Sequence, residues 1–428
     1  MTDKKNLLII GASGGVARAL LKLLAPDRER FGALTLVDRC DRLRADPFLP
    51  TDALRAEFLQ ADFDAVAAPE AYRSLLKARD IHVAVDLSVN ETRPMLAETD
   101  AAGVCYLNTG IANRIGEEFS EVVFDLIRRK TAGWRMPHIL CAGMNPGVVN
   151  LWVQQGITRH GLPQRITHFE YDDGRPCGKW RPVITWSRET FIDEIANDPA
   201  GYMEGRDRLR RLYPNPLKNR MPMDDILSPI LPLAVYPRGF LLLHEENLTI
   251  AQRDDLPSRF LFANDMRTMD HLEGCYDRGA LSVDSLFLGD NLDLEVRGAA
   301  TIGIRLEYED RWVYRYNRTD HGAMPGSSGS CLQVAAGLRA ALLTMAGQAP
   351  EDRLQEALYF CEDLSETLFP RRVEEVLDSC EIVVPVEKGD CRRGVAQSSA
   401  SGPWDRTAPM AGRAPRIEAQ HQTTAFRK

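Results

Sequence analysis

A glycine-rich turn near the N-terminus restricts the fold of this chain more than any other feature of its sequence. The apolar run 7–10 precedes the turn, and the segment after it carries apolar residues at the spacing of one helix face: Val16, Leu20, Leu23 and Leu24. A tight strand-to-helix turn lets the backbone approach a pyrophosphate at the positive end of the helix. We therefore predict a dinucleotide site formed by Gly11, Ser13, Gly14, Gly15 and Val16.

Short apolar runs alternate with helix-period segments through the first 147 residues. The runs expected to be strands after the first one are residues 33–37, 58–60, 83–89, 104–108 and 138–141. Strand and helix alternating in this way is typical of a parallel sheet with helices on both faces. The sequence thus predicts an α/β protein whose residues 1–147 form a Rossmann-like, doubly wound, NAD-binding domain.

The second predicted strand ends at Asp38. A carboxylate at this position accepts hydrogen bonds from the adenosine ribose and repels a 2′-phosphate, which favours NAD over NADP. Arg39 follows directly and leaves NADP open as an alternative. Ligands of such sheets bind at the carboxyl ends of the strands. We therefore expect Ser88, Val89 and Asn108 to complete the cofactor site.

The remainder of the chain has a different texture. Residues 148–325 are predicted to be an α+β substrate and dimerisation domain with a mostly antiparallel sheet, because apolar residues alternate over 304–316. Residues 326–386 are expected to form helices that return to the first domain, at 332–346, capped by Ser327 or Ser328, and at 352–368. Residues 387–428 lack periodicity and are predicted to be a disordered tail that the fold does not need.

Composition excludes several classes of protein. Lys and Arg number 53 against 61 Asp and Glu, giving a net charge of −8, so we expect no nucleic acid partner. The one basic segment, 206–220, is interpreted as a solvated helical face or pocket rim. No apolar run approaches the roughly 18–20 residues of a membrane span. The nine cysteines lack any C-x-x-C pair, which predicts reduced thiols, a cytoplasmic location and no metal site.

The segment Asn145-Pro146-Gly147, after the sixth predicted strand, resembles a motif of the saccharopine dehydrogenase-like superfamily. Asn-Pro-Gly in place of Asp-Pro-Gly makes bacterial homospermidine synthase the closer match. Further stretches are similar to that family in the same order: 168–172 with Glu170, 185–187 with Trp186 followed by Glu194, 239–250 with His244 and Glu246, and 332–334. The resemblance covers most of residues 6–385.

The resemblance implies a catalytic set and a reaction. The set is Asn145, Glu170, Trp186, Glu194 and His244. The reaction is a redox-neutral coupling of diamines, in which bound NAD oxidises an amine to an imine, a second amine replaces ammonia, and the new imine is reduced. Carboxylates suit the two ammonium groups of a diamine, and an aromatic face offers a cation–π contact. The chain departs from the family near 299–303, where an expected acid is missing, and between 194 and 238. A homodimer is expected.

Two alternative functions are compatible with the same sequence. The first is reductive amination of an aldehyde or keto acid by an amino acid, with net consumption of NAD(P)H. That reaction needs a cation for the substrate carboxylate, and Arg181, Arg188 or the segment 206–220 are the candidates. The second alternative is a non-enzymatic dinucleotide sensor, which has no need of the acids Glu170 and Glu194.

Overall fold

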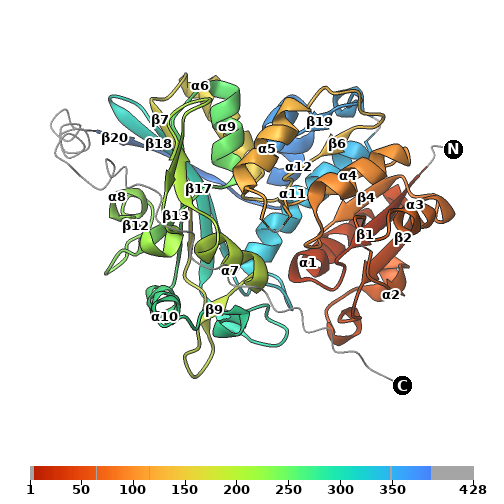
Figure 1. Cartoon of the computed structure of the whole chain (residues 1–428), viewed down its shortest axis with the longest axis horizontal. Helices are drawn as coiled ribbons and strands as arrows, with labels where there is room; N and C mark the ends of the chain where they lie inside the picture. The colour runs from red at the N-terminus through yellow and green to blue at the C-terminus, as the bar shows by residue number, and fades with distance from the viewer. Residues whose placement is uncertain (1–3, 64, 115, 348, 387–428) are drawn as a thin grey trace.

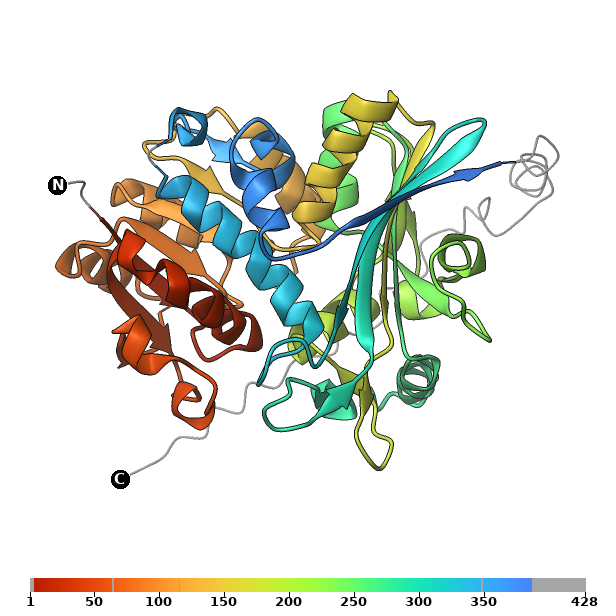
Figure 2. The same ribbon diagram turned by 180° about the vertical axis from the view of Figure 1, so that it is seen from behind.

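The computed structural model describes residues 4–386 except 64, 115 and 348. The predicted tail, 387–428, lies outside the described residues. Two large sheets dominate the described part and lie on either side of the long helix α11 (Gly329–Met345) (Figure 1; Figure 2). No helix in this part of the chain is long and apolar enough to cross a membrane.

The first sheet has seven strands, all parallel, in the order β19-β6-β5-β4-β1-β2-β3. Its strands are β1 (Lys5–Ile10), β2 (Phe31–Asp38), β3 (Glu57–Gln60), β4 (Val83–Asp86), β5 (Cys105–Asn108), β6 (His138–Ile139) and β19 (Leu358–Tyr359). The helices associated with it are α1 (Gly15–Leu24), α2 (Thr51–Leu54), α3 (Pro69–Ala78), α4 (Thr92–Ala101) and α5 (Phe119–Arg128). The predicted Rossmann-like α/β fold is confirmed.

Alternation along β1 explains why helices cover both faces of this sheet. Leu7 and Ile9 belong to the core that contains α1 and α11, whereas Leu8 and Ile10 belong to the core of α3, α4 and α5. Successive side chains of a strand point to opposite faces, so an uninterrupted apolar run is buried on both. Strand β4 ends at Asp86, so Ser88 and Val89 lie in the loop after it rather than within the expected strand.

The second sheet has nine strands and is mostly antiparallel, as predicted, with one parallel pair, β7 and β14. Its strands are β7 (Arg165–Asp172), β10 (Ala200–Met203), β11 (Leu209–Leu212), β12 (Arg220–Pro222), β13 (Arg238–Leu242), β14 (Ser258–Asn264), β17 (Ala299–Glu307), β18 (Arg311–Asp320) and β20 (Cys380–Pro385). Two short pairs join β9 (Val183–Ile184) to β15 (Phe287–Leu288) and β8 (Arg175–Pro176) to β16 (Val296–Arg297).

Helices cover both faces of the nine-stranded sheet. They are α6 (Val148–His160), α7 (Arg188–Ala196), α8 (Asp224–Leu227), α9 (Glu245–Asp254) and α10 (Met266–Asp277). Figure 1 shows α7 and α9 on the side that faces the seven-stranded sheet and α10 on the opposite side. The segment predicted as antiparallel, 304–316, is the hairpin of β17 and β18.

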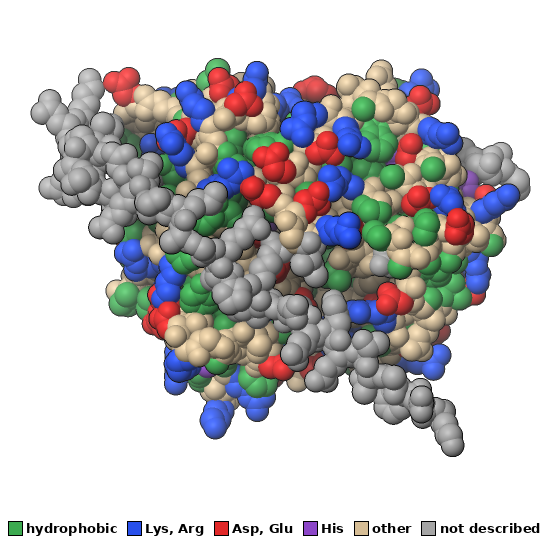
Figure 3. Space-filling view, viewed as in Figure 1, with side chains coloured by type: hydrophobic (Ala, Val, Ile, Leu, Met, Phe, Trp, Pro, Cys, Tyr) green, Lys and Arg blue, Asp and Glu red, His purple; other side chains and the backbone are tan. Residues whose placement is uncertain are grey.

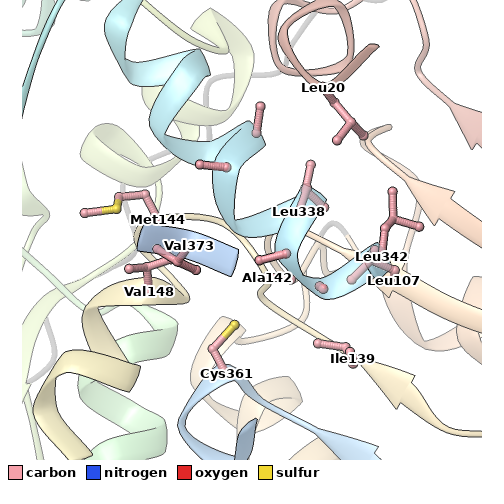
Figure 4. Close-up of a cluster of buried hydrophobic side chains, with 14 of the residues drawn as sticks. Leu20, Leu107, Ile139, Ala142, Met144, Val148, Leu338, Leu342, Cys361 and Val373 are labelled. Atoms are coloured by element: carbon pink, nitrogen blue, oxygen red, sulfur yellow. The ribbon is translucent and has the colours of Figure 1, made fainter. Parts of the chain in front are cut away.

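Helix α11 joins the two halves, and its buried face is shown in Figure 4. It begins where the side chain of Ser328 accepts a hydrogen bond from the backbone of Cys331 at 3.1 Å, which is one of the two predicted caps. Leu338 and Leu342 are fully buried and share one core with Leu20 of α1 and Leu107 of β5. The apolar residues of α11 therefore bind the C-terminal part of the chain to the first sheet.

The predicted helix at 352–368 is wrong. This stretch contains 3-10 turns (Pro350–Asp352; Cys361–Leu364) and strand β19, and the next helix is α12 (Phe369–Glu374). The backbone of β19 pairs with β6, since His138 donates to Ala357 at 2.9 Å and Leu140 to Tyr359 at 2.8 Å. These hydrogen bonds join β19 to a strand that lies more than 200 residues earlier in the sequence. Local periodicity does not reveal such distant pairing, and here the pairing outweighs helix formation.

The basic segment 206–220 is not helical, which corrects the predicted helical face. It contains the edge strand β11 and a 3-10 turn (Pro216–Lys218). Several of its cations form ion pairs: Arg211 with Glu118, Lys218 with Glu273, and Arg220 with Asp270 and Glu273. Lys218 and Arg220 do line a surface cavity of about 330 Å³, so the pocket-rim interpretation fits this end of the segment. On the face drawn in Figure 3, basic and acidic side chains are interspersed.

Truncating Leu338 tests the role of α11. Because this side chain is fully buried, Leu338→Ala should lower the free energy of unfolding by about 2–5 kcal/mol in chemical denaturation. The matched control is Leu162→Ala, at a side chain that is 67% exposed, which should change stability by less than about 0.5 kcal/mol. Equal effects of the two substitutions would contradict the assigned core.

Candidate functional site

The glycine turn after β1 has the shape predicted for it. Gly11 has a φ of +74°, and a Cβ there would lie 2.5 Å from the carbonyl oxygen of Leu87, so the turn requires glycine at this position. Helix α1 begins at Gly15, and Gly14 caps it without a side-chain hydrogen bond. Gly14 and Gly15 therefore present backbone without side chains at the start of α1, where Val16 follows, and this is the arrangement that accommodates phosphate groups.

The carboxylate of Asp38 lies beside this turn. Its Oδ2 accepts a hydrogen bond from the backbone of Ser13 at 2.9 Å, and its Oδ1 accepts one from Cys40 at 3.3 Å. The hydroxyl of Ser13 in turn donates to the carbonyl of Cys40 at 2.6 Å. The end of β2 and the glycine turn are thereby fixed to each other.

The other predicted cofactor residues lie at the same edge of the sheet. Ser88 donates its hydroxyl to Asp86 at 2.6 Å, and Val89 is 59% exposed. Asn108 is buried, and its side chain accepts from the backbone of Cys141 at 2.9 Å and donates to the carbonyl of Gly110 at 2.7 Å. Its amide is therefore committed to holding the loop that leads to Asn145.

Asn145, in the loop after β6, contacts Glu170, so the structure brings together residues associated with the two sheets. The amide of Asn145 donates to Oε2 of Glu170, in the middle strand β7, at 2.5 Å. The turn that holds Asn145 depends on Gly147, whose φ is +137° and where a Cβ would lie 2.3 Å from the carbonyl oxygen of Gly143. Burial raises the pKa of Glu170 to about 8, against a smaller opposing effect of the Asn145 hydrogen bond. This carboxyl group can thus exchange a proton near neutral pH.

His244, at the start of α9, lies among three carboxylates. Its Nδ1 contacts Glu246 closely and is 3.2 Å from Glu245, and its Nε2 is 3.7 Å from Oε1 of Glu194 on α7. Burial alone would lower the pKa of His244, but the charges of Glu246 and Glu245 raise it well above its ordinary value. Burial also raises the pKa of Glu245 to about 7. The structure therefore assembles a buried imidazolium and a surplus of carboxylate groups.

Glu245 and Glu246 were not among the predicted site residues. Acids at a helix start are ordinary, since they favour the positive end of the helix dipole, and only their burial marks these two as exceptional. Ligand atoms of His244, Glu245 and Glu246 lie within 4.8 Å of one another, close enough to hold a cation. The ion pair between His244 and Glu246 already satisfies the charges of those two residues.

Trp186 follows β9 and packs into an aromatic wall. Its ring contacts Phe191 and Phe262 edge-on, with centroids 5.7 and 6.5 Å away. Phe262 lies on β14, where it is paired in register with Glu170 of β7. The ring of Phe262 therefore lies next to both Trp186 and the carboxyl group of Glu170. Ser187 caps α7 by accepting from the backbone of Thr190 at 3.2 Å, and this cap fixes the helix that carries Glu194.

The comparisons with known proteins bear on the fold. No family model matches the sequence, and no curated protein matches it. The structure is similar to that of a homospermidine synthase from Legionella pneumophila in complex with NAD, with a TM-score of 0.70 and 14% identity over 89% of this chain and 92% of that one. It also matches a myo-inositol 2-dehydrogenase from Lactobacillus plantarum, with a TM-score of 0.41 and 7% identity over 90% and 100% of the two chains.

The protein thus has a two-sheet fold of the kind found in Rossmann-type NAD-using enzymes. The similarity to the homospermidine synthase covers both sheets, and at 14% identity it is a similarity of fold.

The state of Glu170 predicts a dependence of stability on pH. Since its pKa in the folded protein lies above the ordinary value of 4.5, the wild type should lose stability as the pH rises from about 4.5 through about 8. Glu170→Gln lacks this titration, so its stability relative to wild type should rise by on the order of 4 kcal/mol between pH 5 and pH 9. Urea unfolding at the two pH values measures the difference.

The control for this experiment is Glu189→Gln, at an exposed position on α7, which should show no such trend. A Glu170→Gln variant that tracks the wild type at both pH values would show that Glu170 is ionised throughout.

Proposed function

We propose that this chain is an NAD-dependent enzyme of the homospermidine synthase kind, which couples diamines through an imine with release of ammonia. The observation that carries the proposal is the hydrogen bond of Asn145 to the buried carboxyl group of Glu170, with the His244 carboxylate cluster on the same nine-stranded sheet. A dinucleotide-binding fold alone does not require buried acids at this place.

The residues at the turn fit a nicotinamide dinucleotide. Gly11 lets the loop after β4 lie against the turn, since a Cβ would collide with the carbonyl of Leu87, and Asp38 stands at the position that meets an adenosine ribose. When bound there, the dinucleotide would accept a hydride from the substrate carbon and return it later. Asp38 supports NAD rather than NADP.

The acids suit a substrate with two ammonium groups. An alkylammonium has a pKa of about 10.4, the ordinary value of a lysine side chain, about two units above that of Glu170. Burial thus narrows the pKa gap between the two groups from about six units to about two, so the ionised form of Glu170 can take the proton of a bound ammonium and free the nitrogen lone pair, which oxidation of the adjacent carbon requires. Glu194 and Glu245 can hold the second ammonium by charge-assisted hydrogen bonds.

Other residues around Glu170 can stabilise and shield the cationic iminium intermediate. The face of Trp186 can stabilise it by a cation–π contact of about 2 kcal/mol in a desolvated site. Glu170 is only 5% exposed, so the same burial that raises its pKa also protects the imine from hydrolysis. On β17, Ile302 lies beside Glu170 in register, within the stretch 299–303 where the family resemblance leads us to expect an acid, and it offers an apolar contact for the alkyl chain.

Reductive amination fits the structure less well. Of the arginines proposed to bind a substrate carboxylate, Arg181 stacks on Phe287 at 4.9 Å and Arg188 donates to the carbonyl of Leu286 at 3.4 Å. Arg211 pairs with Glu118. Because these arginines already contact other groups of the protein, they are poorly placed to bind a substrate carboxylate, and a diamine is favoured over an amino acid as substrate. A homodimer formed through the nine-stranded sheet and a cytoplasmic location stay predictions.

Substitutions at the acids test the proposed function. Glu170→Gln and Glu194→Gln should each lower turnover of putrescine at least a hundredfold, because they remove the proton acceptor and an ammonium ligand. NAD binding, measured by calorimetry, should be unchanged, since neither residue belongs to the glycine turn. Trp186→Phe should retain more activity than Trp186→Ala. Wild-type turnover in both Gln variants, followed by mass detection of products, would place the site elsewhere.

The cofactor preference has its own test. NAD(H) should bind more tightly than NADP(H), and Asp38→Ala should weaken NAD binding several-fold while narrowing the difference between the two cofactors. Calorimetry in which NADPH binds the wild type more tightly would contradict the assignment and favour the reductive alternative.

A further inference from the structure

A buried polar cluster lies directly behind Trp186 and is not part of the site described above. Its centre is Asp172, two residues beyond Glu170 on β7. The carboxylate accepts hydrogen bonds from His321 Nε2 at 3.0 Å, from Ser330 at 3.2 Å, from the backbone of Gly174 at 2.8 Å, and from the hydroxyl of Thr185. Asp172 and His321 are fully buried. This carboxylate is therefore satisfied by four donors from separate parts of the chain.

The cluster is tied to the first turn of α11. The backbone N–H of Gly329 donates to Nδ1 of His321 at 3.2 Å, so the ring carries its proton on Nε2, facing Asp172. Burial alone would raise the pKa of Asp172, but His321 and the hydroxyl of Thr185 hold it below the ordinary value. Ionised Asp172 thus links β7 to the start of α11 through one imidazole ring.

Thr185 is held on its backbone as well as its side chain. Its carbonyl oxygen accepts from the hydroxyl of Ser328 at 2.7 Å and from Sγ of Cys331 at 3.5 Å. Thr185 immediately precedes Trp186, whose ring lies in the aromatic wall of the proposed amine site. The first turn of α11 therefore sets the position of the backbone from which Trp186 projects.

The same turn of α11 touches the glycine turn on its other side. A Cβ at Gly15 would lie 2.9 Å from Sγ of Cys331, so the start of α1 and the start of α11 are in direct contact. Figure 2 shows α11 running between α1 and the nine-stranded sheet. One helical turn thus contacts both the predicted phosphate site and the residue before Trp186.

We propose that the first turn of α11, with Asp172, His321 and Thr185, couples dinucleotide binding to the position of Trp186, so that amine binds more tightly once the dinucleotide is bound. This inference rests on the proposed function. The physical basis is that a pyrophosphate would contact the N-terminal turn of α1, against which Cys331 packs, while Cys331 bonds to the carbonyl of Thr185 and Ser330 lies 2.8 Å from its hydroxyl. Thr185, Asp172, His321 and Ser330 are positioning residues, since they act through Trp186. Such coupling between two sites is reciprocal.

The test compares binding of putrescine with and without saturating NADH, a pair that cannot turn over. In the wild type NADH should tighten putrescine binding at least about fivefold, within the usual range of coupling between sites. Thr185→Val keeps the shape of the side chain and removes the hydroxyl that bonds to Asp172. It should reduce the ratio to less than about twofold while NADH binding alone is unchanged. The control Thr158→Val, which removes a hydroxyl on α6 that bonds only to Gln154, should keep the wild-type ratio.

Hydrogen exchange provides a readout that does not depend on the amine. NADH should slow exchange at residues 183–187 in the wild type and in Thr158→Val, but not in Thr185→Val. If NADH slows this exchange and putrescine binds no form of the protein, the coupling stands and the proposed function fails. A wild type without an NADH effect on exchange, or a Thr185→Val variant with the wild-type ratio, would overturn the inference.

Discussion

The burial of one carboxyl group, Glu170, sets the conditions that the rest of the site must meet. A carboxylate removed from water is strongly destabilised unless it is protonated, paired or hydrogen-bonded. Here the amide of Asn145 supplies one hydrogen bond, and burial keeps the pKa near 8. Both the neutral and the ionised forms of the group are consequently populated near physiological pH, and the ionised form is a stronger base than an ordinary carboxylate. Such a base can accept the proton of a bound ammonium group, with a smaller pKa gap to overcome than for a glutamate in water.

The two-sheet architecture makes this arrangement possible. Asn145 comes from the loop that follows β6 of the parallel sheet, Glu170 from the centre of the nine-stranded sheet, and His244 from the start of a helix on that second sheet. The return of the chain through α11, whose apolar face is buried against α1 and β5, holds the two sheets beside each other. The energy that brings the polar groups together is therefore supplied by burial of apolar surface elsewhere.

Features that depend on local sequence could be predicted. The turn at Gly11 and the helix at α11 follow from periodicity and from residues suited to turns and caps, so they required no knowledge of distant contacts. The helix predicted over 352–368 is wrong because β19 forms by pairing with β6, far away in the sequence. Glu245 and Glu246 were overlooked as site residues because an acid at a helix start has the same sequence signal whether it is exposed or buried. The pairing of Asn145 with Glu170 was reachable only through family resemblance.

The most direct test of the account is the balance of electrons in the reaction. Putrescine is incubated with a catalytic amount of NAD⁺, while ammonia, coupled polyamine and absorbance of the reduced cofactor are measured together. If the reaction is a redox-neutral coupling of diamines, we expect many turnovers per NAD⁺, one ammonia for each coupled product, and no accumulation of free NADH. Stoichiometric consumption of NAD(P)H with an aldehyde or keto acid, and no turnover of putrescine with NAD⁺, would contradict it and leave the fold unchanged.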